Sequence, residues 1–171
     1  MDKRAYVKIG ERRWREDKGL YLEDLEPGLV IEHRPGRTIT QTDNIWQSLI
    51  NMNQHPIHIN EHYAAETEFG KLLVGGLVTF NIVNGMTVSS VSQKAICHLG
   101  WDKVRFPAPV FVGDTLYAES EVLSRRDSKS RPGQGIVTVE TRGKNQKEEL
   151  VVVFERTILL PSRAQAVAAT R

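Results

Sequence analysis

Three histidines, His55, His58 and His62, fall within eight consecutive residues of this chain. Histidine has an ordinary pKa of about 6.5, so near neutral pH it serves as a general base, a general acid or a metal ligand. His58 and His62 are four residues apart, which on one helix would suit a metal ion. Pro56 and Asn60 argue against one helix through the cluster, and no cysteine lies nearby. We therefore expect no metal site, which leaves capping or surface histidines and a catalytic base as interpretations.

A second feature with chemical meaning is the pair Gly75-Gly76, which precedes an apolar run. Backbone N–H groups at the start of a helix can stabilise a negatively charged oxygen, and glycine allows a ligand to approach the backbone closely. Taken alone, the pair is equally typical of a tight turn that leads into a helix.

Three segments together resemble one known family. Residues 51–60, NMNQHPIHIN, resemble the signature S-G-D-x-N-P-[ILV]-H of MaoC-like dehydratases and R-specific enoyl-CoA hydratases, with Pro56, Ile57 and His58 in matching positions. Residues 72–77, LLVGGL, resemble the start of that family's central helix. Residues 105–116, RFPAPVFVGDTL, resemble its F-x-x-P-V-x-x-G-D-T-L motif. The segments occur in the family's order, and the resemblance covers about residues 20–160.

The resemblance implies an α+β hot-dog fold, in which an antiparallel sheet wraps around one long helix. It implies reversible addition of water to an enoyl thioester of coenzyme A, with no cofactor beyond the coenzyme A of the substrate. His58 would then be the base, and the backbone of Gly76 would hold the thioester oxygen, with Gly75 beside the substrate. His55, which stands where the family has asparagine, would assist. The segments TEFGK and GWDKVRFP look most similar to hydratases of branched dicarboxylic thioesters such as mesaconyl-CoA or itaconyl-CoA, and Arg105 would bind the free carboxylate.

One position departs from the family, because Asn53 stands where the catalytic aspartate is usual. An amide can hold a water molecule but cannot donate or accept a proton at neutral pH. His58 would then perform both proton transfers, or Asp43 or Glu61 would replace the missing acid, or the protein would bind acyl-CoA without catalysis. A hot-dog thioesterase is a further alternative, which would need a carboxylate such as Glu66 or Asp43 to activate water.

A basic stretch and an adjacent cysteine and histidine are two further candidates for function. Residues 125–131, RRDSKSR, form a basic stretch of the kind that is most often a solvated turn, but the family resemblance makes Arg131 a candidate for binding the phosphates of coenzyme A. Cys97 and His98 are adjacent in a segment that we interpret as extended. Neighbouring side chains on a strand point to opposite faces, so we do not expect a thiolate–imidazole pair.

The elements that position these residues follow from hydrophobic spacing. Thr40 or Thr42 is expected to cap a helix that continues to Pro56 and is ended by it, and Asn60 to cap a short helix over residues 61–67. Apolar residues on several sides predict a buried helix over residues 77–93. Strands are expected at residues 29–33, 37–39, 103–106, 115–123, 135–142 and 149–160. Helices followed by a run of strands favour an α+β domain with an antiparallel sheet.

Composition limits the remaining possibilities. The 171 residues suit one domain over residues 19–161, with an N-terminal arm at 1–18 and a flexible tail at 162–171. The 23 Lys and Arg against 21 Asp and Glu give a net charge of +2, which does not suggest nucleic-acid binding. A single cysteine, no apolar leader and glycines within residues 72–88 favour a cytoplasmic protein without a membrane span. A strand edge left exposed by such a sheet predicts a homodimer.

Overall fold

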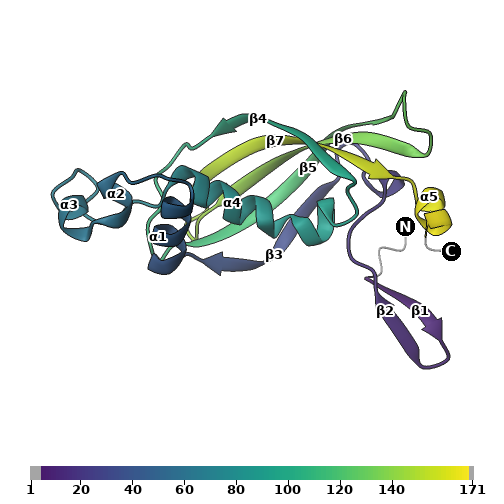
Figure 1. The fold of residues 1–171 in the computed structure, drawn as a ribbon, viewed down its shortest axis with the longest axis horizontal. Coiled ribbons are helices and arrows are strands. Elements are labelled where there is room, and N and C mark those ends of the chain that lie inside the picture. Colours follow the sequence, from purple (N-terminus) through teal and green to yellow (C-terminus); the bar gives the residue numbers. More distant parts are fainter. Residues whose placement is uncertain (1–4, 170–171) are drawn as a thin grey trace.

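A five-stranded antiparallel sheet forms the body of the protein (Figure 1). The computed structural model describes residues 5–169, with side chains described as far as residue 166. The strands lie in the order β3-β5-β6-β7-β4, so that β3 and β4 are the two edges. Their bounds are Val30–Thr38 for β3, Cys97–Arg105 for β4, Thr115–Asp127 for β5, Gln134–Lys144 for β6 and Leu150–Pro161 for β7.

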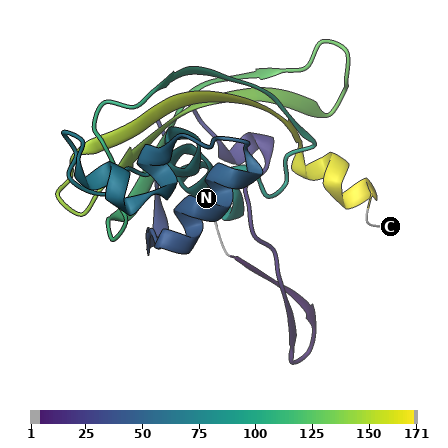
Figure 2. The same cartoon turned by 60° about the vertical axis from the view of Figure 1, so that its left-hand side comes forward.

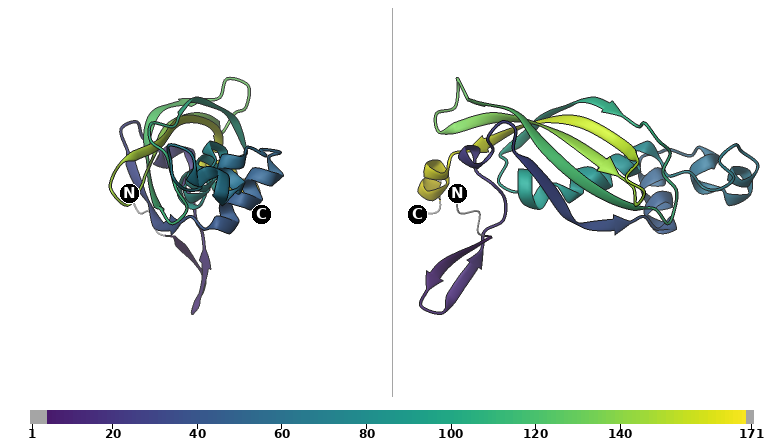
Figure 3. Two further views of the ribbon diagram at one scale, coloured as in Figure 1. Left: turned by 90° about the vertical axis from the view of Figure 1, so that its left-hand side faces the viewer. Right: turned by 180° about the vertical axis from the view of Figure 1, so that it is seen from behind.

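Helix α4, Gly76–Met86, lies against the concave face of this sheet, and the strands curve around it in the end-on view of Figure 3. Val78 and Val83 of α4 belong to the same buried cluster as Leu116 of β5 and Phe154 of β7. One helix held in the curve of an antiparallel sheet is the hot-dog arrangement, so the fold expected from the sequence motifs is confirmed.

Alternation along the strands explains this packing. In β6 every second residue from Gly135 to Gly143 is buried, and the residues between are half exposed. Packing requires glycine at position 143, because a Cβ built there would lie 2.7 Å from Val152 and 2.8 Å from Val83. Glycine at this position therefore lets α4 and β7 approach the sheet closely.

Three short helices precede α4 and lie together at one end of the sheet (Figure 1). They are α1 (Gln41–Ile50), α2 (Pro56–Ile59) and α3 (Glu61–Ala65). Thr40, not Thr42, caps α1: the Thr40 hydroxyl accepts from the Asp43 N–H, and the Asp43 carboxylate accepts from the Thr40 N–H. Asn60 caps α3 as expected, since its side chain accepts from the Tyr63 N–H.

Several predicted boundaries were wrong. Helix α1 ends at Ile50, short of Pro56, because Met52 takes a left-handed conformation with φ of 59°. Pro56 instead begins α2, where its missing N–H costs nothing. The central helix ends at Met86, not at residue 93, and Val88–Ser92 forms a separate π-helical turn, η2. The Thr87 hydroxyl donates to the Asn84 carbonyl at this junction and competes with the helical ladder.

Strand boundaries also differ from the prediction. The two short strands expected at residues 29–33 and 37–39 are one strand, β3, whose register shifts between His33 and Arg37. Strand β4 begins at Cys97, six residues before the predicted start. Cys97 and His98 therefore do lie on a strand, as was interpreted from the sequence.

The two ends of the chain carry structure outside the sheet. Strands β1 (Tyr6–Gly10) and β2 (Arg13–Glu16) form a hairpin that projects from the body, within the region expected to be an arm (Figure 2). A turn of 3-10 helix, η1 (Leu22–Asp24), joins it to the sheet. Helix α5 (Arg163–Ala169) lies in the segment expected to be a flexible tail, and Arg163 pairs with the buried Asp24. Residues 1–4 of the arm and 170–171 of the tail lie outside the described residues. Within the described part of the chain, no helix combines the length and the apolar character that crossing a bilayer would require.

Candidate active site

A pocket of about 340 Å³ opens at the N-terminal end of α4. His58 of α2 and Gly76 of α4 both line it, and Phe106, just after β4, covers the glycine. Apart from these three, its wall is almost wholly apolar and consists of Phe69, Leu73, Val74, Thr79, Pro107, Ala108, Pro109, Val110 and Val151. The structure therefore brings together two residues that the sequence proposed as catalytic, although they lie 18 positions apart.

The His58 ring is held in one tautomer. Its Nδ1 atom lies 2.8 Å from the Leu73 carbonyl oxygen. A carbonyl can only accept, so Nδ1 must carry the proton, and the lone pair of the neutral ring is on Nε2. His58 is half-buried and is the one titratable side chain among the described residues that line the pocket. The arrangement suits a general base.

The start of α4 supplies hydrogen-bond donors. The first intrahelical donor is the Thr79 N–H, which binds the Gly75 carbonyl at 3.1 Å, so the Gly76 N–H has no intrahelical partner. A Cβ built on Gly76 would lie 3.3 Å from the Phe106 ring. Glycine at 76 thus keeps a narrow space open between an unpaired amide and an aromatic ring, where a thioester oxygen could approach.

Asn53 and His55 are not on the pocket wall. They form the turn between α1 and α2, where the Asn53 side-chain oxygen accepts from the His55 N–H at 3.2 Å. His55 caps α2, because its Nδ1 accepts from the Ile57 N–H. The centres of the His55 and His58 rings are 6.0 Å apart. In the single chain, neither Asn53 nor His55 shares the pocket with His58.

None of the carboxylates considered as a substitute acid lines the pocket either. Partial burial raises the pKa of Asp43, but hydrogen bonds from Thr40 and the Arg37 guanidinium outweigh this and hold the pKa below its ordinary value. Glu61 accepts from the Gln41 amide at 2.6 Å. Glu66 directly follows α3, and its carboxylate lies 3.9 Å from His62 Nε2. Each of these groups therefore has a local structural partner.

The two arginines proposed for substrate binding lie in different places. Arg105 is exposed at the end of β4, next in sequence to the pocket residue Phe106. Arg131 is exposed in the turn between β5 and β6, which lies at the opposite end of the sheet from α2 and α3 (Figures 1 and 3). A single chain thus does not bring Arg131 together with His58.

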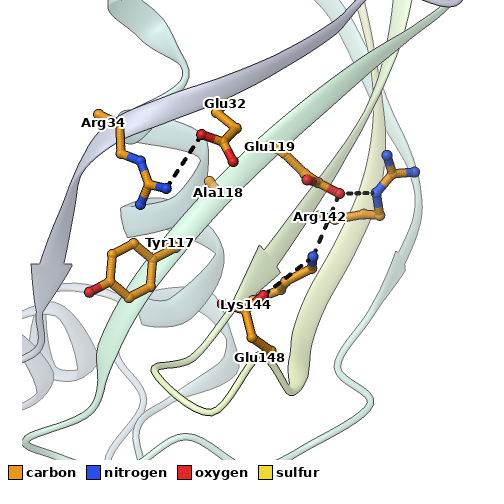
Figure 4. Close-up of a pocket in the computed structure, with 8 residues that line it drawn as sticks. All are labelled: Glu32, Arg34, Tyr117, Ala118, Glu119, Arg142, Lys144 and Glu148. Atoms are coloured by element: carbon orange, nitrogen blue, oxygen red, sulfur yellow. Dashed lines mark hydrogen bonds and ion pairs between the residues drawn. The ribbon is translucent and has the colours of Figure 1, made fainter.

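Two other kinds of polar cluster are weaker candidates for a functional site. Among residues 5–169, no three His, Cys, Asp or Glu side chains are placed to share a metal ion. A groove on the sheet face away from α4 carries several charges, but they pair with one another (Figure 4). Arg142 and Lys144 both lie beside Glu119, at 2.9 and 3.9 Å, and Arg34 lies 3.4 Å from Glu32.

Sequence reasoning missed Asn44 and Phe106 as residues of the site. Asn44 is buried, and its side chain contacts the backbone on both sides of the pocket. Amphipathicity indicated the opposite, since Asn44 and Ser48, one turn apart, form a polar stripe in the helix over residues 41–50 that would be expected to face solvent. The stripe faces inward, whereas Trp46, Leu49 and Ile50 are exposed.

Several known proteins resemble this chain in sequence and in structure. A family model described as mesaconyl-CoA hydratase matches residues 1–170. A mesaconyl-CoA hydratase of Cereibacter sphaeroides is 32% identical over 151 residues, which cover 88% of this chain and 44% of that protein. A solved MaoC domain protein dehydratase from Chloroflexus aurantiacus gives a TM-score of 0.80 at 32% identity, covering 85% of this chain and 41% of that one. A monoamine oxidase regulatory protein from Archaeoglobus gives 0.74 at 32% identity, covering 84% and 95%. The chain spans less than half the length of the mesaconyl-CoA hydratases and of the β-methylmalyl-CoA dehydratase that it matches.

Proposed function

The chain belongs to the MaoC-like hot-dog dehydratase family, and from that premise we propose that it is a hydro-lyase that adds water reversibly to an enoyl thioester of coenzyme A. The observation that carries the proposal is the pocket itself. It combines a histidine whose Nε2 lone pair is free with the unpaired amide at the start of α4.

The proposed reaction uses these two groups directly. His58 Nε2 takes a proton from a water molecule as the water oxygen bonds to the β carbon of the enoyl thioester. Electrons move onto the thioester oxygen, where the Gly76 N–H donates to the developing negative charge. The protonated His58 then delivers its proton to the α carbon as the carbonyl re-forms. One imidazole suffices for both transfers, and Asn53 would serve only to orient water from the neighbouring turn.

For the acyl group we propose a branched dicarboxylic thioester such as mesaconyl-CoA. The family model and the mesaconyl-CoA hydratase of C. sphaeroides support this choice. The described pocket wall contains no cation, so the free carboxylate must reach beyond it, and Arg105, next in sequence to the wall residue Phe106, is the basic residue that we propose for it. We retain Arg131 as a proposed contact for coenzyme A phosphates across an interface between two chains.

We propose that two copies of the chain assemble. One edge of β4 pairs with β7 and the other is an open edge of the sheet. Leu99, Trp101 and Val104 on this strand are exposed, and so are Trp46 and Ile50 of α1. An open edge with exposed apolar side chains favours pairing with a second strand. Light scattering should give twice the 19.3 kDa mass of the chain, and a monomer at micromolar concentration would contradict the proposal.

A non-catalytic acyl-CoA binder is the second candidate function, and Asn53 in place of the usual aspartate favours it. A thioesterase is less favoured, because the described pocket wall offers no carboxylate to activate water. Crotonyl-CoA and mesaconyl-CoA separate the three activities. Hydration removes the conjugated absorbance without releasing thiol, hydrolysis releases thiol, and binding does neither.

The residue-level test is His58→Ala. Loss of a general base should lower turnover by roughly 10²- to 10⁴-fold with little change in stability. His62→Ala is the matched control, since His62 is exposed on the adjacent helix and should retain activity. Equal losses in both variants, reversed by added metal, would contradict the proposed base and favour a metal site.

A further inference from the structure

Asn44 is a buried asparagine that contacts both sides of the candidate site. It lies on the inward face of α1 and is 0% exposed. Its Nδ2 group donates to the His58 carbonyl at 2.8 Å and to the Leu73 carbonyl at 3.3 Å. Its Oδ1 atom accepts from the Gly75 N–H at 3.1 Å. One amide thus links the histidine segment, the strand-like segment before α4, and the start of α4.

These hydrogen bonds affect both the His58 ring and the Gly76 N–H. The Leu73 carbonyl that accepts from Asn44 also accepts from Nδ1 of His58, at 2.8 Å, so Asn44 helps to fix the acceptor that sets the histidine tautomer. At the other side, Asn44 satisfies the Gly75 N–H. The Gly76 N–H is then the first amide of α4 left for a ligand.

We propose that Asn44 is a positioning residue, which fixes the base His58 relative to the Gly76 amide without touching the substrate. The proposal rests on the proposed hydration. Asparagine combines two N–H donors with an acceptor on one short planar group, which is the set that these three backbone partners need. A fully satisfied buried network is rigid, and a displacement of about 1 Å at a reacting group can cost about 10²-fold in rate.

If Asn44 had only a structural role, its loss would affect stability and not catalysis in particular. Asn145 provides a matched control. Asn145 is also buried, at 3% exposed. It makes three hydrogen bonds in the turn between β6 and β7, one through Nδ2 to Glu149 and two through Oδ1 from the N–H groups of Lys147 and Glu149. It does not line the pocket. Asn44→Ala and Asn145→Ala should therefore lose similar stability, while only Asn44→Ala should affect the chemistry.

The first experiment compares the two alanine variants in turnover and in ground-state binding. Asn44→Ala should lower kcat on crotonyl-CoA or mesaconyl-CoA by about 10²-fold, while the Kd for the saturated analogue butyryl-CoA stays within about threefold, because positioning acts on the transition state. Asn145→Ala should change neither by more than about threefold. A folded Asn44→Ala protein with unchanged kcat, or with kcat and Kd weakened in parallel, would overturn the proposal.

The second experiment does not depend on turnover. Acetoacetyl-CoA forms an enolate with its own ultraviolet absorbance, and a site that holds His58 and the Gly76 amide in register should raise the bound enolate fraction. We expect Asn44→Ala to lose this increase and Asn145→Ala to keep it. Loss of the increase with no hydration by the wild type would support Asn44 and reject the hydratase. A wild type that neither hydrates nor raises the enolate fraction overturns both proposals.

Should Asn44→Ala fail to fold, Asn44→Asp tests the same inference. The aspartate can still accept from the Gly75 N–H, but in neither ionisation state can it donate to both carbonyls. We expect kcat to fall at least tenfold. Asn60→Asp is the control, because Asn60 caps α3 only two residues after His58, and aspartate caps a helix equally well. A folded Asn44→Asp protein that retains wild-type kcat, or a matching loss in Asn60→Asp, would contradict the proposal.

Discussion

His33 should make the protein sensitive to acid. It is 3% exposed on β3, and its two ring nitrogens lie 2.8 Å from the Ser90 hydroxyl and 2.9 Å from the Ser120 hydroxyl. Burial, together with the positive charge of Arg156, lowers its pKa from 6.5 to about 4. Arg156 is itself fully buried, and its hydrogen bonds go to the neutral groups Asn84 and Ser92.

The sign of the effect follows from the direction of this shift. The folded-state pKa lies below the unfolded value, so between pH 6.5 and about 4 the unfolded chain binds more protons at this site. The contribution of neutral His33 to the free energy of unfolding is therefore complete above pH 6.5 and is lost progressively as the pH falls to about 4. At about 1.4 kcal/mol per unit of pKa, the full loss is roughly 3 kcal/mol, of which about 2.5 kcal/mol should be gone at pH 4.5. That is a large share of the ~5–15 kcal/mol typical of a domain.

The assay compares urea unfolding of the wild type and His33→Gln at pH 7.5 and pH 4.5. Glutamine can donate to and accept from the two serines but does not titrate. Carboxylates elsewhere titrate in both proteins and cancel in the difference between them. The stability advantage of the wild type should therefore shrink by about 2.5 kcal/mol at the lower pH. His62→Gln, which removes an exposed histidine, should show no such change. A shift below about 1 kcal/mol for His33→Gln would refute the reasoning.

Three further predictions follow from the glycines and from Asn53. Gly76→Ala should lower kcat/KM at least tenfold with little change in melting temperature, because the new methyl lies 3.3 Å from the Phe106 ring in the space proposed for the thioester. Gly143→Ala should reduce the unfolding free energy by about 1–3 kcal/mol in denaturant titration, because its Cβ would lie 2.7 and 2.8 Å from two buried valines. Asn53→Asp should keep or raise activity on crotonyl-CoA but reduce it on mesaconyl-CoA. The new aspartate and the free carboxylate of mesaconyl-CoA, at a separation of ~4 Å, would repel by about 4 kcal/mol at a dielectric of ~20. A change of both rates by the same factor would contradict this reasoning.

The sequence predicted the strands best where alternation was regular. Strands β5, β6 and β7 were located to within a few residues because their buried residues largely alternate with half-exposed ones and are mostly apolar, with Ser120, Thr141 and Arg156 as buried polar exceptions. Strand β4 was placed six residues too late, since its side chains are largely exposed and show no such alternation. Helix ends depended on single backbone conformations, such as the left-handed Met52, that hydrophobic spacing does not report.

The site was predicted in part for a related reason. Motif spacing located His58 and Gly76, but it could not show that Asn53 and His55, in the turn between α1 and α2, do not line the pocket of the single chain. It also could not show that the turn between β5 and β6, which contains Arg131, lies at the end of the sheet opposite α2 and α3. Buried hydrogen-bond networks are the least visible feature of all, because Asn44 and Arg156 are recognisable only once their partners from distant elements are in place.

Two histidines near opposite ends of α4 show why one can do chemistry and the other cannot. His33, towards the C-terminal end, has a serine hydroxyl at each ring nitrogen and does not line the candidate pocket. Its burial and the nearby Arg156 also disfavour taking up a proton. His58, at the N-terminal end, has only Nδ1 engaged, by a carbonyl that can do nothing but accept, so Nε2 is left for a substrate proton. The difference lies in the partners of each ring, and for His58 that partner is the Leu73 carbonyl, which also accepts from Asn44.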